Sequence, residues 1–192
     1  MEELLNYLKK FGNVSETEEQ AIAASFKNTI IPKGEYFTEA GKTSNSIAFV
    51  RSGVFRTLYY NKSGDDFTRY FIYEGRFIGD LQAFTEQTPA TEYTEAITDS
   101  EVWSISFSGF AALEKKVTVW PRLLAKLHGF SIESKLKTAS MMLNLDAKAR
   151  YLHFLQHYPG LANRVPQAML ASYLGVTPSS LSRIRKSILP GR

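Results

Sequence analysis

The sequence predicts an α+β protein in which an all-β barrel or sandwich is followed by a long helix and a C-terminal helix-turn-helix. Three observations predict this order. Short runs of β-branched and aromatic residues alternate with glycine turns over residues 30–107. Apolar residues then recur at helical spacing in a long segment that starts near Pro121. Two short helical segments separated by Gly175 occupy the C-terminal end.

Two short helices are expected before the β region, at residues 2–10 and 15–28. Ser15 opens the second one and Glu18 lies three positions later, which is the spacing of a capping box. Turn glycines then recur 12, 11 and 11 residues apart, a rhythm typical of all-β folds, at Gly41, Gly53, Gly64 and Gly75. The expected strands are residues 28–31, 46–51, 54–60, 68–73, 92–96 and 101–106.

The pattern becomes helical again after the β region. Ser108 is expected to cap a helix at residues 109–115, and Pro121 lies in the first turn of the long helix. The apolar residues of the long helix form a near-heptad stripe that must be buried, so we expect a second copy of the chain to cover it. Packing against the β domain of the same chain is the alternative. The expected dimer interface comprises Leu123, Leu127, Phe130, Ser134 and Met141.

A further helix is expected at residues 147–157, capped by Asp146 and ended by Pro159 and Gly160. The junction at residues 144–146 is a candidate hinge. The chain is therefore expected to divide into a β domain with N-terminal helices, a dimerisation helix with its hinge, and a helix-turn-helix domain. Their boundaries are residues 1–116, 117–145 and 146–192.

The C-terminal segment has the local signals of a helix-turn-helix. Its first helix is expected at residues 167–173, and Gly175 permits the turn. Thr177 can cap the second helix, and Pro178 occupies the first helical position, where a missing N–H costs nothing. One face of the second helix is apolar at spacings of three and four, through Leu181, Ile184 and Ile188. An ordinary helical hairpin is the alternative.

The charge distribution favours a DNA-binding C-terminal end. Residues 1–121 carry 12 Lys and Arg and 17 Asp and Glu, a net charge of −5. Residues 122–192 carry 11 Lys and Arg and only Glu133 and Asp146, a net charge of +9. A basic module favours polyanions because phosphate contacts release counterions. A basic surface that only contacts solvent is the alternative, but such surfaces rarely coincide with a helix-turn-helix pattern.

Composition excludes several classes of protein. Without cysteine there is no disulfide, no cysteine-ligated cluster and no thiol chemistry. No apolar run is long enough to span a bilayer, and the acidic N-terminus lacks the form of a signal peptide. We therefore expect a soluble, cytoplasmic protein with no membrane partner.

Histidines offer the only candidate metal or catalytic site. His153 and His157 are four apart on an expected helix, but ordinary surface histidines explain this spacing better than a metal site. A metal-dependent enzyme built on a β-barrel would need histidines inside residues 30–107, and every histidine lies outside that range. The sequence therefore predicts neither an enzyme nor a cofactor nor a bound metal.

Residues 25–190 together resemble the Crp/Fnr family of bacterial transcription regulators. The resemblance is carried by a glycine-punctuated β region with Gly34 among its turns, a long helix, Asp146 and Arg150 at the junction, and the terminal helix-turn-helix. It implies a jelly-roll-like antiparallel β-roll sensor, a dimerisation helix and a winged-helix-like DNA-binding domain. It also implies a homodimer on an inverted-repeat operator in double-stranded DNA, with RNA polymerase as a candidate partner.

The expected effector region departs from the family pattern. Gly79-Asp80-Leu81 resembles the Gly-Glu-Leu that opens the family's phosphate-binding cassette. The Arg-Ser-Ala that follows in cyclic-nucleotide binders corresponds here to Ala90, Thr91 and Glu92, which removes the phosphate-neutralising arginine. We therefore expect no response to cyclic AMP or GMP. Either another ligand, neutral or cationic, binds this candidate pocket, or the roll has no effector.

The DNA-contacting helix departs too. The family's Arg-Glu-x-x-x-Arg corresponds to Pro178, Ser179 and Arg183, of which only Arg183 can contact guanine bidentately. The residues expected to contact DNA are Gln167, Thr177, Ser179, Ser180, Arg183, Arg185 and Lys186. The alternative function is a ligand-binding or protein-interaction module whose helix-turn-helix is vestigial.

Overall fold

The computed structural model describes residues 1–188, with the exception of the side chains of Leu127, Phe130, Ser131 and Ser134. Three residues of the expected dimer interface, Leu127, Phe130 and Ser134, therefore lie outside the described side chains. The chain forms two compact units. Unit 1 comprises Met1–Thr57 and Phe71–Ile132, and unit 2 comprises Leu58–Tyr70 and the chain from Glu133 onward. The domain boundaries expected from the sequence place residues 58–70 in the β domain, whereas the structure groups them with unit 2.

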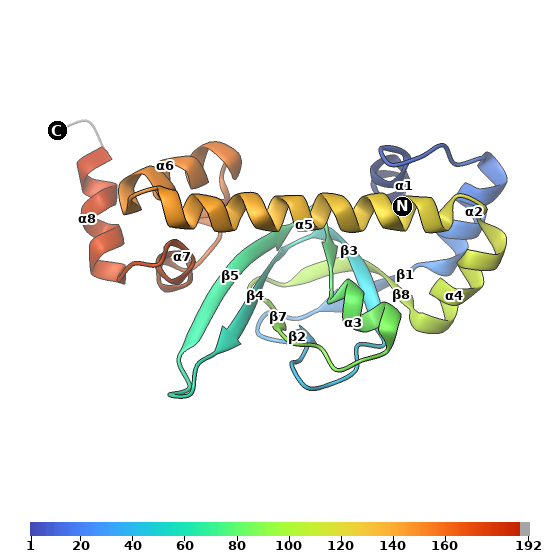
Figure 1. Ribbon diagram of the computed structural model, residues 1–192, viewed down its shortest axis with the longest axis horizontal. Coiled ribbons are helices and arrows are strands. Elements are labelled where there is room, and N and C mark those ends of the chain that lie inside the picture. The colour runs from blue at the N-terminus through green and yellow to red at the C-terminus, as the bar shows by residue number, and fades with distance from the viewer. Residues whose placement is uncertain (189–192) are drawn as a thin grey trace. The chain divides into compact units, whose positions relative to one another are not determined.

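Two four-stranded sheets form the β region (Figure 1). The strands are β1 (Lys27–Ile31), β2 (Tyr36–Thr38), β3 (Ser46–Ser52), β4 (Val54–Tyr60), β5 (Asp66–Tyr73), β6 (Phe77–Ile78), β7 (Tyr93–Ala96) and β8 (Ser100–Ser106). The sheet orders are β1-β8-β3-β6 and β2-β7-β4-β5. β8 pairs antiparallel with both neighbours, so that Val102 lies opposite Thr29 on β1 and Val50 on β3. The antiparallel roll expected from the sequence is confirmed.

The sequence did not predict three short elements. β2 has three residues, β6 has two, and helix α3 (Leu81–Glu86) has six, which is too short for a helical or alternating pattern to develop. The predicted strands are otherwise present, with ends that differ by one or two residues. All four turn glycines have positive φ, as a glycine-punctuated roll requires.

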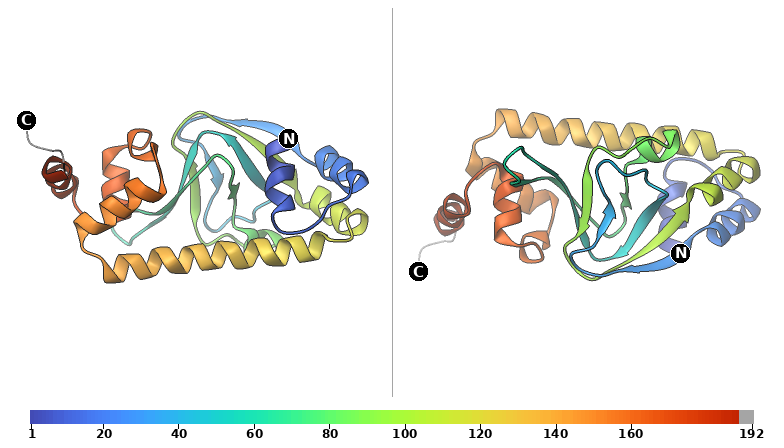
Figure 2. Two further views of the ribbon diagram at one scale, coloured as in Figure 1. Left: turned by 90° about the horizontal axis from the view of Figure 1, so that it is seen from above. Right: turned by 90° about the horizontal axis from the view of Figure 1, so that it is seen from below.

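Helices α1 (Glu2–Lys9), α2 (Glu16–Ser25) and α4 (Phe107–Lys116) complete unit 1. The predicted capping box is confirmed, because the Ser15 hydroxyl accepts a hydrogen bond from the Glu18 N–H and the Glu18 carboxylate accepts one from the Ser15 N–H. Ser106, and not Ser108, caps α4, because the strand before it ends at Ser106. α2 and α4 lie side by side (Figure 2).

The core of unit 1 joins these helices to the first sheet. It comprises Leu4, Leu8, Ile22, Phe26, Ile47, Phe49, Phe84, Ile105, Phe110, Leu113, Val117, Trp120 and Leu123. The last two residues come from the first turns of α5 (Trp120–Asn144), the long helix expected from the sequence. This helix is therefore anchored in the unit at its N-terminal end.

The side chains of α5 correct the predicted dimer stripe. Leu123 is 1% exposed and Met141 is 8% exposed in the single chain, so neither offers apolar surface to a partner. Leu123 was expected in the interface, but it instead fills the core beneath Gly12, where a Cβ would lie 3.0 Å from the Leu123 Cδ2. The alternative, packing against the β domain of the same chain, therefore holds for Leu123, and Met141 is buried within the single chain.

Unit 2 contains α6 (Ala147–His157), the short 3-10 helix η1 (Leu161–Asn163), α7 (Gln167–Leu174) and α8 (Pro178–Ile188). Asp146 caps α6 as predicted, through a 2.8 Å hydrogen bond from the Ala149 N–H. The buried side chains of the unit gather around these helices, with Phe154 1% exposed and Leu170, Leu174 and Leu181 fully buried. Residues 133–188 contain helices only, so the described part of this segment has no strand that could form a wing.

The hairpin end of β4 and β5 belongs to unit 2 and contacts α7. The Thr68 N–H donates to the Ser172 Oγ at 3.0 Å, and Lys135 lies 5.1 Å from the centre of the Tyr70 ring. These contacts join residues 65 to 104 positions apart in the sequence, so no local pattern could have predicted them. Within residues 1–188, no helix has both the length and the apolar character needed to cross a bilayer.

Candidate nucleic-acid interface and effector region

The turn between α7 and α8 has the geometry of a helix-turn-helix. Gly175 adopts the left-handed conformation, φ 67° and ψ 37°, and its N–H bonds back to the carbonyls at the end of α7. Ala171 is fully buried near the turn, where a small residue lets the two helices approach. Leu181 on α8 is also fully buried. The predicted helix pair and its glycine turn are confirmed.

Hydroxyl groups organise the first turn of α8. The Thr177 Oγ1 accepts a hydrogen bond from the Ser180 N–H at 3.2 Å, which confirms the predicted N-cap. The same hydroxyl lies 3.0 Å from the Ser179 Oγ and donates to the Ser180 Oγ at 2.9 Å. Gln167 at the start of α7 donates to the Pro178 carbonyl at 3.0 Å, which ties the two helix starts together. Four of the seven residues expected to contact DNA therefore lie at one end of the pair.

The face of α8 opposite the core is polar and cationic. Ser179, Arg183 and Lys186 follow one another at spacings of four and three, and all three side chains are exposed. A helix brings such positions onto one face, while Leu181 is fully buried on the other. The Arg183 Nη2 donates to the Ser180 Oγ at 3.3 Å, and the side chain is exposed. This face has the shape and charge that a major groove accepts.

Arg185 is placed differently from the other expected DNA contacts. Its Nε donates to the Tyr151 hydroxyl at 3.1 Å, and its guanidinium lies 5.7 Å from the centre of the Tyr151 ring. Tyr151 is a buried residue of α6. The side chain of Arg185 therefore joins α8 to α6, away from the face formed by Ser179, Arg183 and Lys186.

Comparison with known proteins agrees with this architecture. Residues 29–116 match the family model of the cyclic nucleotide-binding domain. The fold of FixK2 from Bradyrhizobium japonicum superposes with a TM-score of 0.75 at 16% identity, over 85% of this chain and 84% of that one. The global regulator CLP of Xanthomonas campestris, described as responsive to c-di-GMP, gives a TM-score of 0.68 at 18% identity over 91% of both chains.

A transcriptional regulator from Eubacterium rectale assigned to the Crp/Fnr family gives a TM-score of 0.70 at 16% identity, over 95% of this chain and 87% of that one. The chain has the Crp/Fnr fold. No curated protein sequence matches it significantly. The domain match and the fold thus confirm the sequence resemblance.

In this Crp/Fnr-like chain the expected phosphate cassette contains its own carboxylate. Asp80 follows Gly79 and caps α3, with its Oδ1 accepting from the Ala83 N–H at 3.1 Å. The other oxygen, Oδ2, lies 3.5 Å from the N–H of Thr91. The Asp80 carboxylate thus accepts from N–H groups of both halves of the expected cassette, at Ala83 and at Thr91. Leu81 follows Asp80 and is only partly exposed.

The second half of the cassette offers no positive charge. Ala90 is 3% exposed and is fixed by backbone hydrogen bonds with Gly41 and Lys42. The next residue, Thr91, is exposed, and Glu92 is partly exposed. Because Ala90 is enclosed, an arginine side chain would not fit there without displacing its neighbours.

One buried cation of the roll was missed by the sequence analysis. The Arg56 Nε on β4 lies 2.7 Å from the Glu95 Oε2 on β7, and Arg56 is only 5% exposed. The two residues are 39 positions apart, so only the pairing of strands brings them together. Because Glu95 already neutralises it, Arg56 does not replace the missing phosphate-binding arginine without separating a buried pair.

The histidines do not form a metal site among the described residues, which contain no cluster of three metal-binding side chains. The rings of His153 and His157 stack with their centres 3.8 Å apart, and the His157 Nδ1 lies 2.9 Å from the His153 carbonyl oxygen. Burial lowers the pKa of His153, and the neighbouring His157 lowers it further. The pair is therefore best described as part of the α6 packing.

Proposed function

We propose that this protein is a DNA-binding transcription regulator that acts as a homodimer on an inverted-repeat operator and does not respond to cyclic AMP or GMP. The observation that carries the proposal is the exposed row of Ser179, Arg183 and Lys186 on α8. The row lies opposite a fully buried Leu181, so α8 can enter a groove without disturbing the core of unit 2.

Each residue of the row has a distinct role in the proposal. Arg183 contacts a guanine bidentately through O6 and N7, which discriminates that base by about 1–3 kcal/mol. Ser179 and Ser180 contribute single hydrogen bonds to bases or phosphates, and Lys186 contacts a phosphate. Gln167, at the start of α7, is hydrogen-bonded to the start of α8 and can therefore contact the same stretch of DNA backbone. One arginine per half-site leaves the rest of the sequence preference to weaker contacts.

An exposed apolar seam on α5 supports the homodimer. Its members recur at alternating spacings of four and three, which is the heptad pattern of a two-stranded coiled coil. They are Ala125, Gly129, Ile132, Leu136, Ala139 and Leu143, and all are exposed in the single chain. Ile132, Leu136 and Leu143 are 56%, 65% and 86% exposed. A second copy of the same seam covers these side chains, and the small residues at its start let two helix backbones approach closely.

The missing phosphate-binding arginine supports the absence of a cyclic-nucleotide response. Buried Ala90 stands at its position, and Glu92, two residues later, adds a negative charge. A cyclic phosphate brought here without a paired cation costs several kcal/mol of desolvation. Any effector of this roll is accordingly neutral or cationic, or the roll has none.

The decisive experiment is a selection of bound sequences from random duplexes with the full chain. We expect enrichment of an inverted repeat whose half-site centres are about 34 Å apart, one helical turn. In the matched pair of variants, Arg183→Ala relaxes one base per half-site, whereas Lys186→Ala weakens all duplexes equally.

The alternative function makes a different prediction for the same selection. A ligand-binding or protein-interaction module with a vestigial helix-turn-helix would return no palindrome and would fail to retain any duplex even at low salt. That result, with a chain that is folded by circular dichroism, would overturn the proposed function.

A further inference from the structure

A small pocket lies in unit 1, well away in sequence from both the DNA-contacting helix and the phosphate cassette. It is about 230 Å³ in volume and is lined by Gly12, Asn13, Val119, Arg122, Leu123 and Lys126. The first two residues belong to the turn between α1 and α2, and the others to α5 and the residue before it. Leu123 is almost fully buried and forms the apolar base.

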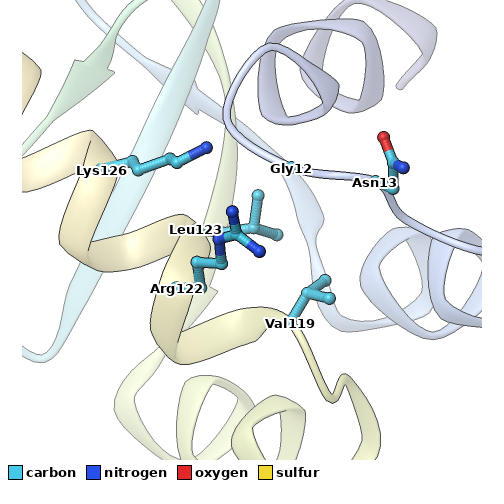
Figure 3. A pocket seen from close by; sticks show the side chains of 6 residues that line it. All are labelled: Gly12, Asn13, Val119, Arg122, Leu123 and Lys126. Atoms are coloured by element: carbon cyan, nitrogen blue, oxygen red, sulfur yellow. The ribbon is translucent and has the colours of Figure 1, made fainter.

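Two cations of α5 extend toward this turn. Arg122 and Lys126 are four residues apart and therefore project from the same face of the helix. Figure 3 shows both side chains reaching from α5 toward the backbone at Gly12 and Asn13. The Asn13 side chain lies beyond Gly12, and its amide is not directed toward the two cations. The charged donors of the lining therefore both come from α5.

Neither cation is neutralised by a neighbour. Within residues 1–188, Arg122 and Lys126 take part in no ion pair or side-chain hydrogen bond, and none of the six lining residues is acidic. Two of the three carboxylates in the first turn of α2 already have other partners. Glu18 accepts from the Ser15 and Thr118 N–H groups, each at 2.9 Å, and Glu19 lies 2.7 Å from the Lys9 ammonium.

Gly12 allows the turn to approach α5 closely at the pocket. A Cβ at Gly12 would lie only 3.0 Å from the Leu123 Cδ2, so the absence of a side chain lets the turn settle on the helix. At roughly 30 Å³ for each water molecule, the volume holds a small ion or the head of a small molecule, and not a nucleotide. Two cations four residues apart on one helix favour a doubly charged oxyanion.

We propose that this pocket binds a phosphoryl group, as the free ion or as the phosphate of a small phosphorylated molecule. The guanidinium of Arg122 and the ammonium of Lys126 supply the charge and the hydrogen-bond donors. The site is separate from the roll's cassette, where Ala90 replaces the phosphate-binding arginine and Glu92 is acidic. On this proposal, an anionic effector binds at the N-terminal end of α5 and not in the roll.

The test uses the full chain labelled with nitrogen-15 and titrated with inorganic phosphate, pyrophosphate and glycerol 3-phosphate. We expect saturable shifts of the Gly12 backbone amide and the Asn13 side-chain amide. Arg122→Gln combined with Lys126→Gln should weaken binding about tenfold or more, because two charge-assisted hydrogen bonds are lost. A larger effect of glycerol 3-phosphate than of the free ions would identify a phosphorylated metabolite as the source, and the reverse would identify the ion itself.

The matched control is Lys115→Gln combined with Lys116→Gln, which removes the same charge from exposed positions of α4 in the same unit. It should bind like the unaltered chain. Equal weakening by both double variants, shifts confined to residues of α7 and α8, or no saturable shift at millimolar probe would overturn the proposal. Because the affected residues lie in unit 1, failure here leaves the DNA-binding test untouched, and the reverse also holds.

Discussion

Gly175 sets the path of the chain between α7 and α8 through its positive φ of 67°. An L-residue in this conformation costs about 1–2 kcal/mol, so Gly175→Ala should destabilise unit 2 by about that amount. A Cβ there would also lie 3.2 Å from the Arg150 Nη1. Gly175→Asn should cost less, since asparagine tolerates this region. Urea denaturation of both variants measures the difference, and equal losses would show that backbone conformation is not the cause.

His153 gives unit 2 a pH-dependent stability. Burial lowers the pKa of its imidazole, and the charge of His157 adds to the effect. The unfolded chain, with a pKa of about 6.5, then binds protons more readily than the folded chain. This contribution to stability is complete above that value and is lost as pH falls through it toward the lowered pKa.

Thermal denaturation at pH values from about 7 down to about 5 tests this effect. His153→Gln should flatten the loss of stability in that range, whereas Gln156→Ala, an exposed substitution on α6 that removes no titratable group, should leave it as it is. An unchanged pH profile in the His153 variant would assign the acid sensitivity to other groups.

At the scale of the element, α5 shows where sequence patterns stop being sufficient. The helix carries one apolar row that enters its own unit, with Leu123 as a member, and a second row that is exposed. Spacing alone describes both rows equally well. Which row faces a partner depends on how the N-terminal helices pack, and contacts between Gly12 and Leu123 have no local signal in the sequence.

The helix-turn-helix, by contrast, was predictable almost residue by residue. Its signals are local: a cap at Thr177, a proline at the first position and a glycine in the turn all act within a few residues. The Arg56–Glu95 pair and the Thr68–Ser172 hydrogen bond depend on strands and helices that meet only in the fold. The same contrast explains why Arg185 was expected at the DNA surface and lies against Tyr151.

The exposed seam gives a direct prediction for α5. Leu136 is 65% exposed in the single chain, so Leu136→Asp should leave the isolated fold intact while placing a charge in the dimer interface. Loss of one buried leucine contact is worth up to about 1.5–3 kcal/mol, and two such charges would face each other. Analytical ultracentrifugation should find monomers. Leu152→Asp, at a 43% exposed position of α6, is the control and should remain dimeric.

At the scale of the whole molecule, charge is the property that the sequence predicts best. The excess of basic residues lies after residue 121, and the hairpin residues 58–70 that join unit 2 add two basic and two acidic residues, and hence no net charge. Under the proposed function, phosphate contacts from this basic part make affinity depend on salt, because each neutralised phosphate releases counterions. The proposed base contact of Arg183 adds discrimination to this dependence.

Lys186→Ala should therefore reduce the slope of log affinity against log salt by about 0.9 for each phosphate contact that is lost. A dimer loses two such contacts, one per half-site, whichever duplex is used. Lys33→Ala, which removes an exposed charge from the acidic unit 1, should leave the slope unchanged. Fluorescence anisotropy over a range of salt concentrations measures both. If the Lys186 variant kept the full slope while Arg183→Ala lowered it, Arg183 would be the phosphate contact and the base preference would have to come from Gln167 and the hydroxyls around Thr177.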